Sequence, residues 1–158
     1  NVLINLCELN KIEWVIAVPH NIIGPRQKYD DPFRNVVSIM INRMLQKKSP
    51  IIYGDGLQSR DFTFIQDVVQ ANLNAAISTK SNGKVINIGT GNITTIKDLA
   101  RIIARIMSSN LEPICSEARD GDIKHSFADI SRARNLINYE PAYTLERGLE
   151  LTIDSTIP

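Results

Sequence analysis

The sequence is short of cysteine and aromatic residues, and it contains no long apolar run. Cys7 and Cys115 are its two cysteines, and neither stands in a C-x-x-C motif, which argues against a disulfide framework and favours a reducing compartment. His20 and His125 do not form a zinc site with them at any usual spacing. No run approaches the roughly 18 apolar residues that span a bilayer, and no signal peptide opens the chain. We therefore expect a cytoplasmic protein that holds no metal ion and contacts no membrane.

An excess of charge of either sign is also lacking. The 158 residues include 18 basic and 17 acidic side chains, so no global field attracts the chain to nucleic acid. Between Pro25 and Pro50 the balance is locally basic; the basic residues are Arg26, Lys28, Arg34, Arg43, Lys47 and Lys48, and the acidic ones are Asp30 and Asp31. A solvated loop and helix face is the simplest interpretation, and an RNA-binding module is the alternative. Only Tyr29 and Phe33 could stack on bases there, which argues against nucleic acid.

Hydrophobic periodicity predicts an alternation of strands and helices. Helices are expected at 2–10, 34–48, 68–78, 96–107, 128–137 and 144–156. Strands are expected at 13–18, 84–89 and 111–118, and the alternating residues 61–64 predict a further, half-buried strand. This order is typical of an α/β fold with few strands and long loops. At 158 residues the chain is long enough for one such domain with a real core.

Polar residues at several expected helix starts indicate N-caps, which satisfy free backbone N–H groups of the first turn. These residues are Asp67, Thr94 or Thr95, Asp129 and Thr144. Each one predicts that a helix begins directly after it.

The sequence also lacks the motifs of a complete redox or phosphoryl-transfer centre. Two G-x-G pairs occur, Gly54–Gly56 and Gly89–Gly91, but neither extends to the longer glycine pattern of a dinucleotide loop. There is no G-x-x-x-x-G-K-[ST] motif and no Tyr-x-x-x-Lys motif.

What the sequence does offer is a set of groups that suit phosphates and sugars. Arg60 follows the glycine turn within IIYGDGLQSRDFTFI (51–65), and Arg119 opens the turn RDGD (119–122) after an expected strand. A planar guanidinium donates two parallel hydrogen bonds to a phosphate. Asp122 is a pure acceptor and can take both hydroxyls of a ribose. Ordinary surface ion pairs are the alternative for these three residues.

Four ordered motifs carry a resemblance to a known family. The chain contains, in this order, PHNIIGPRQ, IIYGDGLQSRDFTFIQDVVQAN, INIGTGNITTIKDLA and RDGDIKHSFADISRARNLINYEPAYTLERGLELT. Together they resemble the C-terminal half of an extended short-chain dehydrogenase/reductase, of the NAD-dependent nucleotide-sugar epimerase/dehydratase type that includes UDP-glucose 4-epimerase. The resemblance implies that residues 1–20 end a Rossmann domain and residues 21–158 form a nucleotide-sugar-binding domain, with 60–90 partly completing the Rossmann side.

The same resemblance places the catalytic tyrosine and lysine, and the glycine loop for NAD, before residue 1. This chain is then expected to hold no catalytic residue and to be inactive by itself. NAD would be bound mainly by the missing half, with Pro19 and His20 near the nicotinamide. The intact protein would be a homodimer.

The resemblance also implies a nucleotide-sugar site within this chain. Its residues would be Asn21, Asn35, Val36, Ile52, Tyr53, Arg60, Arg119 and Asp122. The first three would hold the sugar and the diphosphate, and Ile52 and Tyr53 would flank the uracil. Arg60 and Arg119 would clasp the pyrophosphate, and Asp122 would take the ribose hydroxyls. The resemblance assigns no ligand role to the turn at 89–91, which is therefore expected to serve backbone packing.

The implied activity is 4-epimerisation of UDP-glucose or another UDP-hexose, in which hydride leaves and returns at C4 of the sugar. A dTDP-glucose 4,6-dehydratase or a UDP-glucuronate decarboxylase would share every group named above, so both stay open. Val18 and Ile23 stand where many relatives carry an arginine and an aromatic residue, which leaves the sugar undefined. A second hypothesis, from another functional class, is a non-catalytic module that binds a nucleotide-sugar or RNA. A third hypothesis is a partly folded half without activity.

Overall fold

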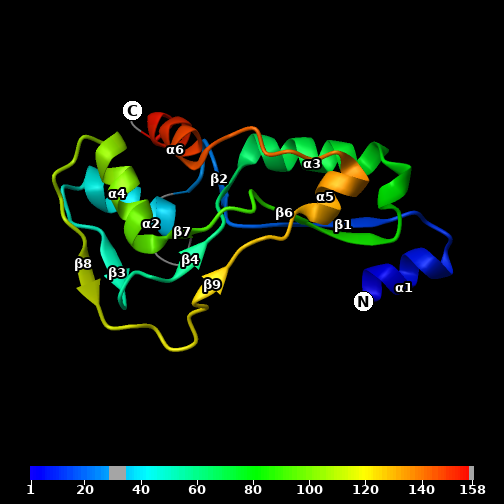
Figure 1. The fold of residues 1–158 in the computed structure, drawn as a ribbon, viewed down its shortest axis with the longest axis horizontal. Helices are drawn as coiled ribbons and strands as arrows, with labels where there is room; N and C mark the ends of the chain where they lie inside the picture. Colours follow the sequence, from blue (N-terminus) through cyan, green and yellow to red (C-terminus); the bar gives the residue numbers. More distant parts are fainter. Residues whose placement is uncertain (29–34, 157–158) are drawn as a thin grey trace.

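The structure, a computed structural model, describes residues 1–28 and 35–156 (Figure 1). Its helices are α1 (Val2–Leu9), α2 (Val36–Leu45), α3 (Ile65–Ile77), the 3-10 turn η1 (Thr79–Ser81), α4 (Ile96–Ile106), α5 (Ser131–Ile137) and α6 (Leu145–Asp154). Its strands are β1 (Val15–Pro19), β2 (Ile22–Ile23), β3 (Ile51–Tyr53), β4 (Ser59–Arg60), β5 (Thr63–Phe64), β6 (Lys84–Ile88), β7 (Thr94–Thr95), β8 (Ile114–Ser116) and β9 (His125–Ser126). Tyr29, Asp30, Asp31, Phe33 and Arg34 lie outside the described residues.

Parallel strand pairs dominate, which confirms the predicted α/β class. β1 pairs with β6, β2 with β5 and β3 with β8, all in parallel, and β4 lies between antiparallel β7 and parallel β9. A parallel pair needs a crossover connection, and α3 lies on the connection between β1 and β6. The strands are shorter than expected, because only 114–116 of the predicted strand 111–118 pair with a neighbour.

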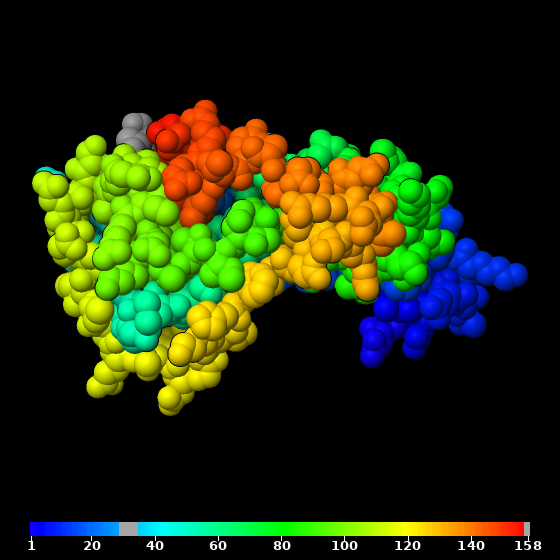
Figure 2. Space-filling model, in the orientation of Figure 1, coloured from blue at the N-terminus to red at the C-terminus, as the bar shows by residue number. Residues whose placement is uncertain are grey.

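The elements gather into two lobes, which Figure 1 shows side by side. The first, called here the cavity lobe, contains β3, β8, α2, α4 and α6; the second, the sheet lobe, contains β1, β6, α1, α3 and α5. Each lobe has its own buried cluster of apolar side chains. The space-filling view shows the surface hollowed between the lobes on the lower side (Figure 2). Among the described residues, no helix combines the length and apolar character needed to cross a membrane.

The sheet lobe leaves much apolar surface exposed. The strand predicted at 13–18 is present as β1, but none of its residues is fully buried, so the expected burial is wrong in this chain. Helix α1 buries no residue, and the exposed fractions of Val2 and Leu9 are 76% and 81%. The start of the sheet is held by backbone contacts, since the Gly83 N–H donates to the Trp14 carbonyl at 2.7 Å. Parallel strands are normally covered on both faces, so this two-stranded sheet is unusually open.

Two of the predicted capping residues cap helix starts. The Thr95 hydroxyl accepts from the Asp98 N–H at 3.0 Å, and the Thr144 hydroxyl accepts from the Arg147 N–H at 3.2 Å. Short-range sequence signals were sufficient for these two because donor and acceptor lie within three residues of each other. The expected cap at Asp129 is wrong, because Ile130 occupies the N-cap position of α5; Asp129 lies one residue further out, and its Oδ1 accepts from the Ser131 N–H at 2.9 Å.

The expected cap at Asp67 is wrong. Helix α3 begins at Ile65, two residues earlier, and the Asp67 side chain is 3% exposed within its first turn. Its carboxylate accepts instead from the backbone N–H groups of Ala142 at 2.9 Å and Tyr143 at 3.3 Å. Asp67 therefore fixes the segment that leads into α6, a contact across 75 residues that local pattern does not reveal.

The strand expected at 61–64 is confirmed only in its second half, and its expected half-burial is wrong. Only Thr63 and Phe64 pair as a strand, and all four residues are buried. The polar members of the alternation therefore face the protein interior as well. Thr63 is 0% exposed, like Asp61 before it.

Asp61 holds the turn that follows β6. Its carboxylate accepts from the Thr90 N–H, the Thr90 hydroxyl at 2.6 Å, the Gly91 N–H at 2.9 Å and the Ala128 N–H at 3.2 Å. A Cβ at Gly89 would stand 2.6 Å from Asp61 Oδ2, so the glycine leaves room for the carboxylate. The turn at 89–91 thus serves backbone packing, as the sequence predicted.

Candidate functional site

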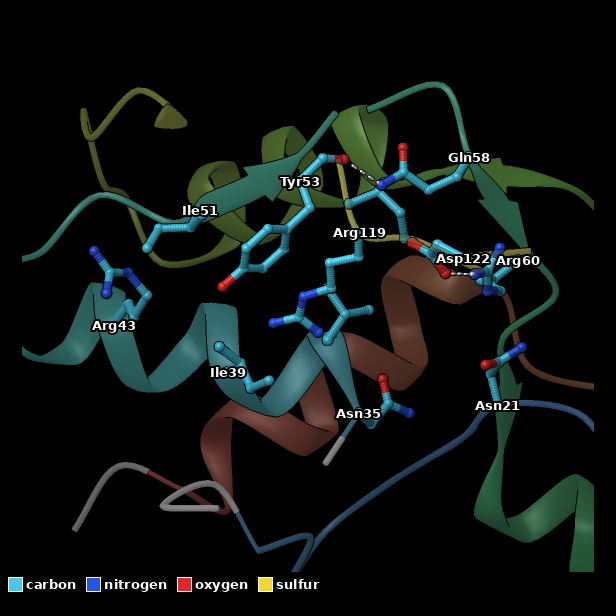
Figure 3. A pocket seen from close by; sticks show the side chains of 12 residues that line it. Asn21, Asn35, Ile39, Arg43, Ile51, Tyr53, Gln58, Arg60, Arg119 and Asp122 are labelled. Atoms are coloured by element: carbon cyan, nitrogen blue, oxygen red, sulfur yellow. Dashed lines mark hydrogen bonds and ion pairs between the residues drawn. The ribbon is translucent and has the colours of Figure 1, made fainter. Parts of the chain in front are cut away.

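A cavity of about 650 Å³ opens on the cavity lobe, a volume in the range of small-molecule sites (Figure 3). Its walls come from α2, β3, β4, the start of α4, the turn at 119–122 and the segment before β2. The lining residues are Asn21, Asn35, Val36, Ile39, Arg43, Ile51, Tyr53, Gln58, Arg60, Ile96, Arg119 and Asp122.

Two asparagines at this cavity are fixed by backbone contacts. Asn35 caps α2, since its Oδ1 accepts from the Val37 N–H at 3.1 Å while its Nδ2 donates to the Ile22 carbonyl at 3.2 Å. Asn21 adopts a positive φ of 26°, and its Nδ2 donates to the Asp61 carbonyl at 3.0 Å. Each amide is therefore held in one orientation before any ligand arrives.

A glycine turn brings β3 and β4 to the same cavity. Gly54 and Gly56 have φ values of 75° and 74°, a region that side chains rarely adopt. Gln58 closes the turn, since its Nε2 donates to the Tyr53 carbonyl at 2.7 Å. The chain thereby reverses between Tyr53 and Arg60, and both side chains reach the cavity.

Arg60 forms the best-anchored charged group of the cavity. Its Nη2 lies 2.9 Å from Asp122 Oδ1, and its Nη1 donates to the Ile123 carbonyl at 2.6 Å and the Ser59 carbonyl at 2.8 Å. The Arg60 side chain is 17% exposed, against 41% for Asp122. The turn that carries Asp122 is closed by its own N–H, which donates to the Arg119 carbonyl at 3.3 Å.

Arg119 lies over the ring of Tyr53. Its guanidinium carbon is 3.8 Å from the ring centroid, a cation–π contact, and Figure 3 shows the two side chains next to each other at the cavity. Arg119 has no ion pair among residues 1–28 and 35–156. Within the described part of the chain, no carboxylate pairs with the positive charge that it brings to the cavity.

Three arginines and one carboxylate line the cavity, so its charge favours an anionic ligand. Arg60 and Asp122 neutralise each other, whereas Arg43 and Arg119 form no ion pair within the described part of the chain. A diphosphate carries the charge and the acceptor oxygens that two guanidiniums can bind.

The structure brings together seven of the eight residues expected at a nucleotide-sugar site. They are Asn21, Asn35, Val36, Tyr53, Arg60, Arg119 and Asp122. Ile52 is not among them, because its side chain is 2% exposed and packs in the core of the cavity lobe. Strand alternation explains this, since Ile51 and Tyr53 face the cavity and the residue between them faces away. The roles assigned to these residues stay predictions.

Pro19 and His20 lie elsewhere, at the carboxyl end of β1 and outside the lining of the cavity. The His20 N–H donates to the Ile88 carbonyl at the end of β6. In open α/β sheets, ligands bind at the carboxyl ends of the strands. This edge can form one wall of a dinucleotide site, but the sequence contains no glycine loop to complete it.

Sequence reasoning missed several lining residues, of which Arg43 is the most important chemically. It was interpreted as part of a solvated helix face. A usable signal was present, because Val36, Ile39 and Arg43 are spaced three and four residues apart and such residues share a helix face. Once Val36 was expected at the site, the same spacing could have indicated Arg43.

Comparisons with known proteins agree on one family. A profile described as the NAD dependent epimerase/dehydratase family matches residues 1–89. A protein of Methanocaldococcus jannaschii is 37% identical over 145 residues, which are 90% of this chain and 45% of that protein. The chain therefore spans about half the length of the curated relatives it matches.

Solved structures give the same result. The UDP-glucose 4-epimerase of Thermotoga maritima, solved with UDP-glucose, matches with a TM-score of 0.92 and 33% identity, over 98% of this chain and 49% of that one. The UDP-glucuronic acid 4-epimerase of Bacillus cereus, solved with UDP-glucuronic acid and NAD, matches with a TM-score of 0.86 and 33% identity, over 98% and 48%. These homologues bind UDP-sugars, and the second also binds NAD.

Proposed function

We propose, since the chain belongs to the NAD-dependent epimerase/dehydratase family, that it is the C-terminal, substrate-binding half of a UDP-hexose 4-epimerase. Residues 1–20 would then end the Rossmann domain, and residues 21–158 would bind the nucleotide-sugar. A dehydratase or a decarboxylase of the same family would use the same groups, and the choice among these reactions depends on residues outside this chain.

One observation carries the proposal. Arg60 and Arg119 lie 59 positions apart on different elements, yet both line one cavity together with Asp122. Nothing in the local sequence forces this arrangement. Its charge and size suit a nucleoside diphosphate joined to a sugar.

Each end of such a ligand finds a matching group. Arg119 would leave the Tyr53 ring and donate to the pyrophosphate. Arg60 would donate to the same pyrophosphate, from the opposite side of the Asp122 carboxylate. The ribose hydroxyls would donate to Asp122, which pairs with Arg60 through one oxygen. Asn35, oriented by its capping contact, would face the sugar and the phosphates.

NAD, when bound, supplies the hydride acceptor of the family reaction, and Pro19 and His20 would form part of its wall. The residues of this chain would contribute by orienting the sugar and matching the charge of the diphosphate. The exposed apolar surface of α1 and β1 supports a missing Rossmann half that packs on the sheet lobe. The intact protein would be a homodimer.

The test is a titration of the chain with UDP by calorimetry. Loss of a charge-assisted hydrogen bond costs about 1.5–3 kcal/mol, so Arg60→Ala and Arg119→Ala should each weaken UDP binding by roughly 10-fold to 100-fold. Arg101→Ala is the matched control, because Arg101 is exposed on α4 and does not line the cavity. Absence of UDP binding, or equal binding by all three variants, would contradict the proposal.

A further inference from the structure

The two ends of the cavity differ in character (Figure 3). Ile39, Ile51 and Tyr53 gather at one end, and Arg43 lies beside them. The amide side chains and the carboxylate lie toward the other end. A flat base fits the first end, because it can pack against an aromatic ring and two branched apolar side chains. The polar end is left for the ribose, the phosphates and the sugar.

Arg43 is held in place at the apolar end. Helix α2 carries it one turn after Ile39, and its Nε donates to the Ser49 carbonyl at 2.6 Å. This bond fixes the plane of the guanidinium and leaves the two terminal nitrogens with no partner among residues 1–28 and 35–156. A guanidinium only donates hydrogen bonds, so those nitrogens match an acceptor on a ligand.

The other two arginines of the cavity are engaged in different ways. Arg60 already donates to Asp122 and to two carbonyls, and Arg119 covers the Tyr53 ring. Arg43 is therefore the arginine whose terminal nitrogens have no partner in the described part of the chain, at the end where a base would lie.

We infer that Arg43 reads the base of the bound nucleotide and selects uracil or thymine over cytosine. The inference deepens the proposed function and rests on it, because it takes the ligand to be a nucleotide-sugar. Uracil and thymine present a carbonyl oxygen at ring position 4, which accepts from Arg43. Cytosine presents an amino group there, and two donors facing each other leave both unpaired.

The experiment compares UDP with CDP, which share the ribose and the diphosphate and differ only in the base. The unmodified chain should prefer UDP. Arg43→Met should weaken UDP binding by about 10-fold and CDP binding much less. The ratio of the UDP affinity to the CDP affinity should therefore fall toward one. Arg43→Lys keeps the positive charge without the planar fork, and it should lose most of the preference as well.

Arg101→Met serves as the control, because it removes an exposed arginine outside the cavity. Thermal melts verify that each variant is folded. If Arg43→Met is not folded, the comparison is made with Arg43→Lys. Equal loss of UDP and CDP would mean that Arg43 contacts the diphosphate, and unchanged binding would mean that it contacts nothing; either result overturns the inference while the proposed function stands. Failure of the unmodified chain to bind UDP would overturn the proposed function itself.

Discussion

The two lobes differ in how completely they bury their own apolar side chains. In the cavity lobe, α4 packs against α2 and α6 and buries Leu99 and Ile103 fully. In the sheet lobe, α3 and α5 pack against the strands, but the exposed fraction of α1 side chains such as Leu3 and Leu6 exceeds half. The first lobe has a closed core and a preformed cavity. The second leaves apolar surface of its sheet and of helix α1 exposed.

This contrast indicates which properties the chain possesses by itself. The cavity is built from side chains that are already fixed by caps, turns and ion pairs, so ligand binding can be tested on this chain alone. Properties that depend on the open sheet would need the Rossmann half proposed above. The three predictions below act on the contact that joins the lobes, on the difference between their cores and on a peripheral ion pair.

The largest effect is expected at Asp61, which joins the lobes. Its buried carboxylate accepts from four donors on the turn after β6 and on the segment before α5. Asp61→Ala leaves these donors unpaired, and we expect a loss of about 3–5 kcal/mol in the free energy of unfolding, measured in urea. Asp55→Ala is the control, because Asp55 accepts only from the Leu57 N–H in an exposed turn. Equal stability of the two variants would show that Asp61 does not hold the lobes together.

A pair of identical substitutions measures the difference between the two cores. Leu99 is 0% exposed in the cavity lobe, whereas Leu6 is 54% exposed on α1. Leu99→Ala should cost about 3 kcal/mol in the free energy of unfolding, because it removes buried methyl groups and leaves a cavity, whereas Leu6→Ala should cost close to zero. Leu6→Ala should instead reduce self-association and the binding of a hydrophobic fluorescent dye, since it removes exposed apolar surface. A large loss of stability at Leu6 would mean that the sheet lobe is complete without a partner.

The smallest effect is expected at the ion pair of Arg134 and Glu140. The two side chains pair through two contacts of 2.8 Å, and the hydrogen bond from Arg134 lowers the pKa of Glu140. A lowered pKa adds stability above the pKa of the unfolded carboxyl, and this stability is lost as the pH falls through the folded-state value. Glu140→Gln should therefore lower the urea midpoint slightly at neutral pH, and this difference should shrink as the pH falls below 4.5 and as salt is added. If the difference in urea midpoint persists in acid, the effect of Glu140→Gln comes from packing and not from the ion pair.

Local signals predicted much of the fold. Thr95 and Thr144 cap their helices as expected, because a cap depends on residues within one turn. Asp67 was also expected to cap a helix, because aspartate is a good N-cap residue, yet its carboxylate accepts from the Ala142 N–H far along the chain, which no local signal reveals. The half-burial predicted for residues 61–64 was wrong for a similar reason, because partners on distant turns make the burial of Asp61 possible.

The site was predictable where a motif fixed the residue and not where only helix geometry did. The resemblance supplied Arg60, Arg119 and Asp122, and the structure brings all three to one cavity. It also supplied Ile52, whose side chain faces the core, because a motif match does not reveal the direction of a strand residue. Arg43 escaped notice because an arginine on an amphipathic helix is usually solvated.

The sequence contains one tryptophan, Trp14, and it lies at the entrance to β1 in the sheet lobe. Its indole does not line the cavity, whereas Tyr53 does. The fluorescence of Trp14 therefore reports on the sheet lobe, whereas the four tyrosines do not single out one lobe, since Tyr53 lines the cavity and Tyr139 is buried in the sheet lobe. A partner half that packs on the sheet should shift the tryptophan emission toward the blue, and a nucleotide that displaces Arg119 from the Tyr53 ring should leave it unchanged. The molecule thus carries an optical reporter for one of its two surfaces.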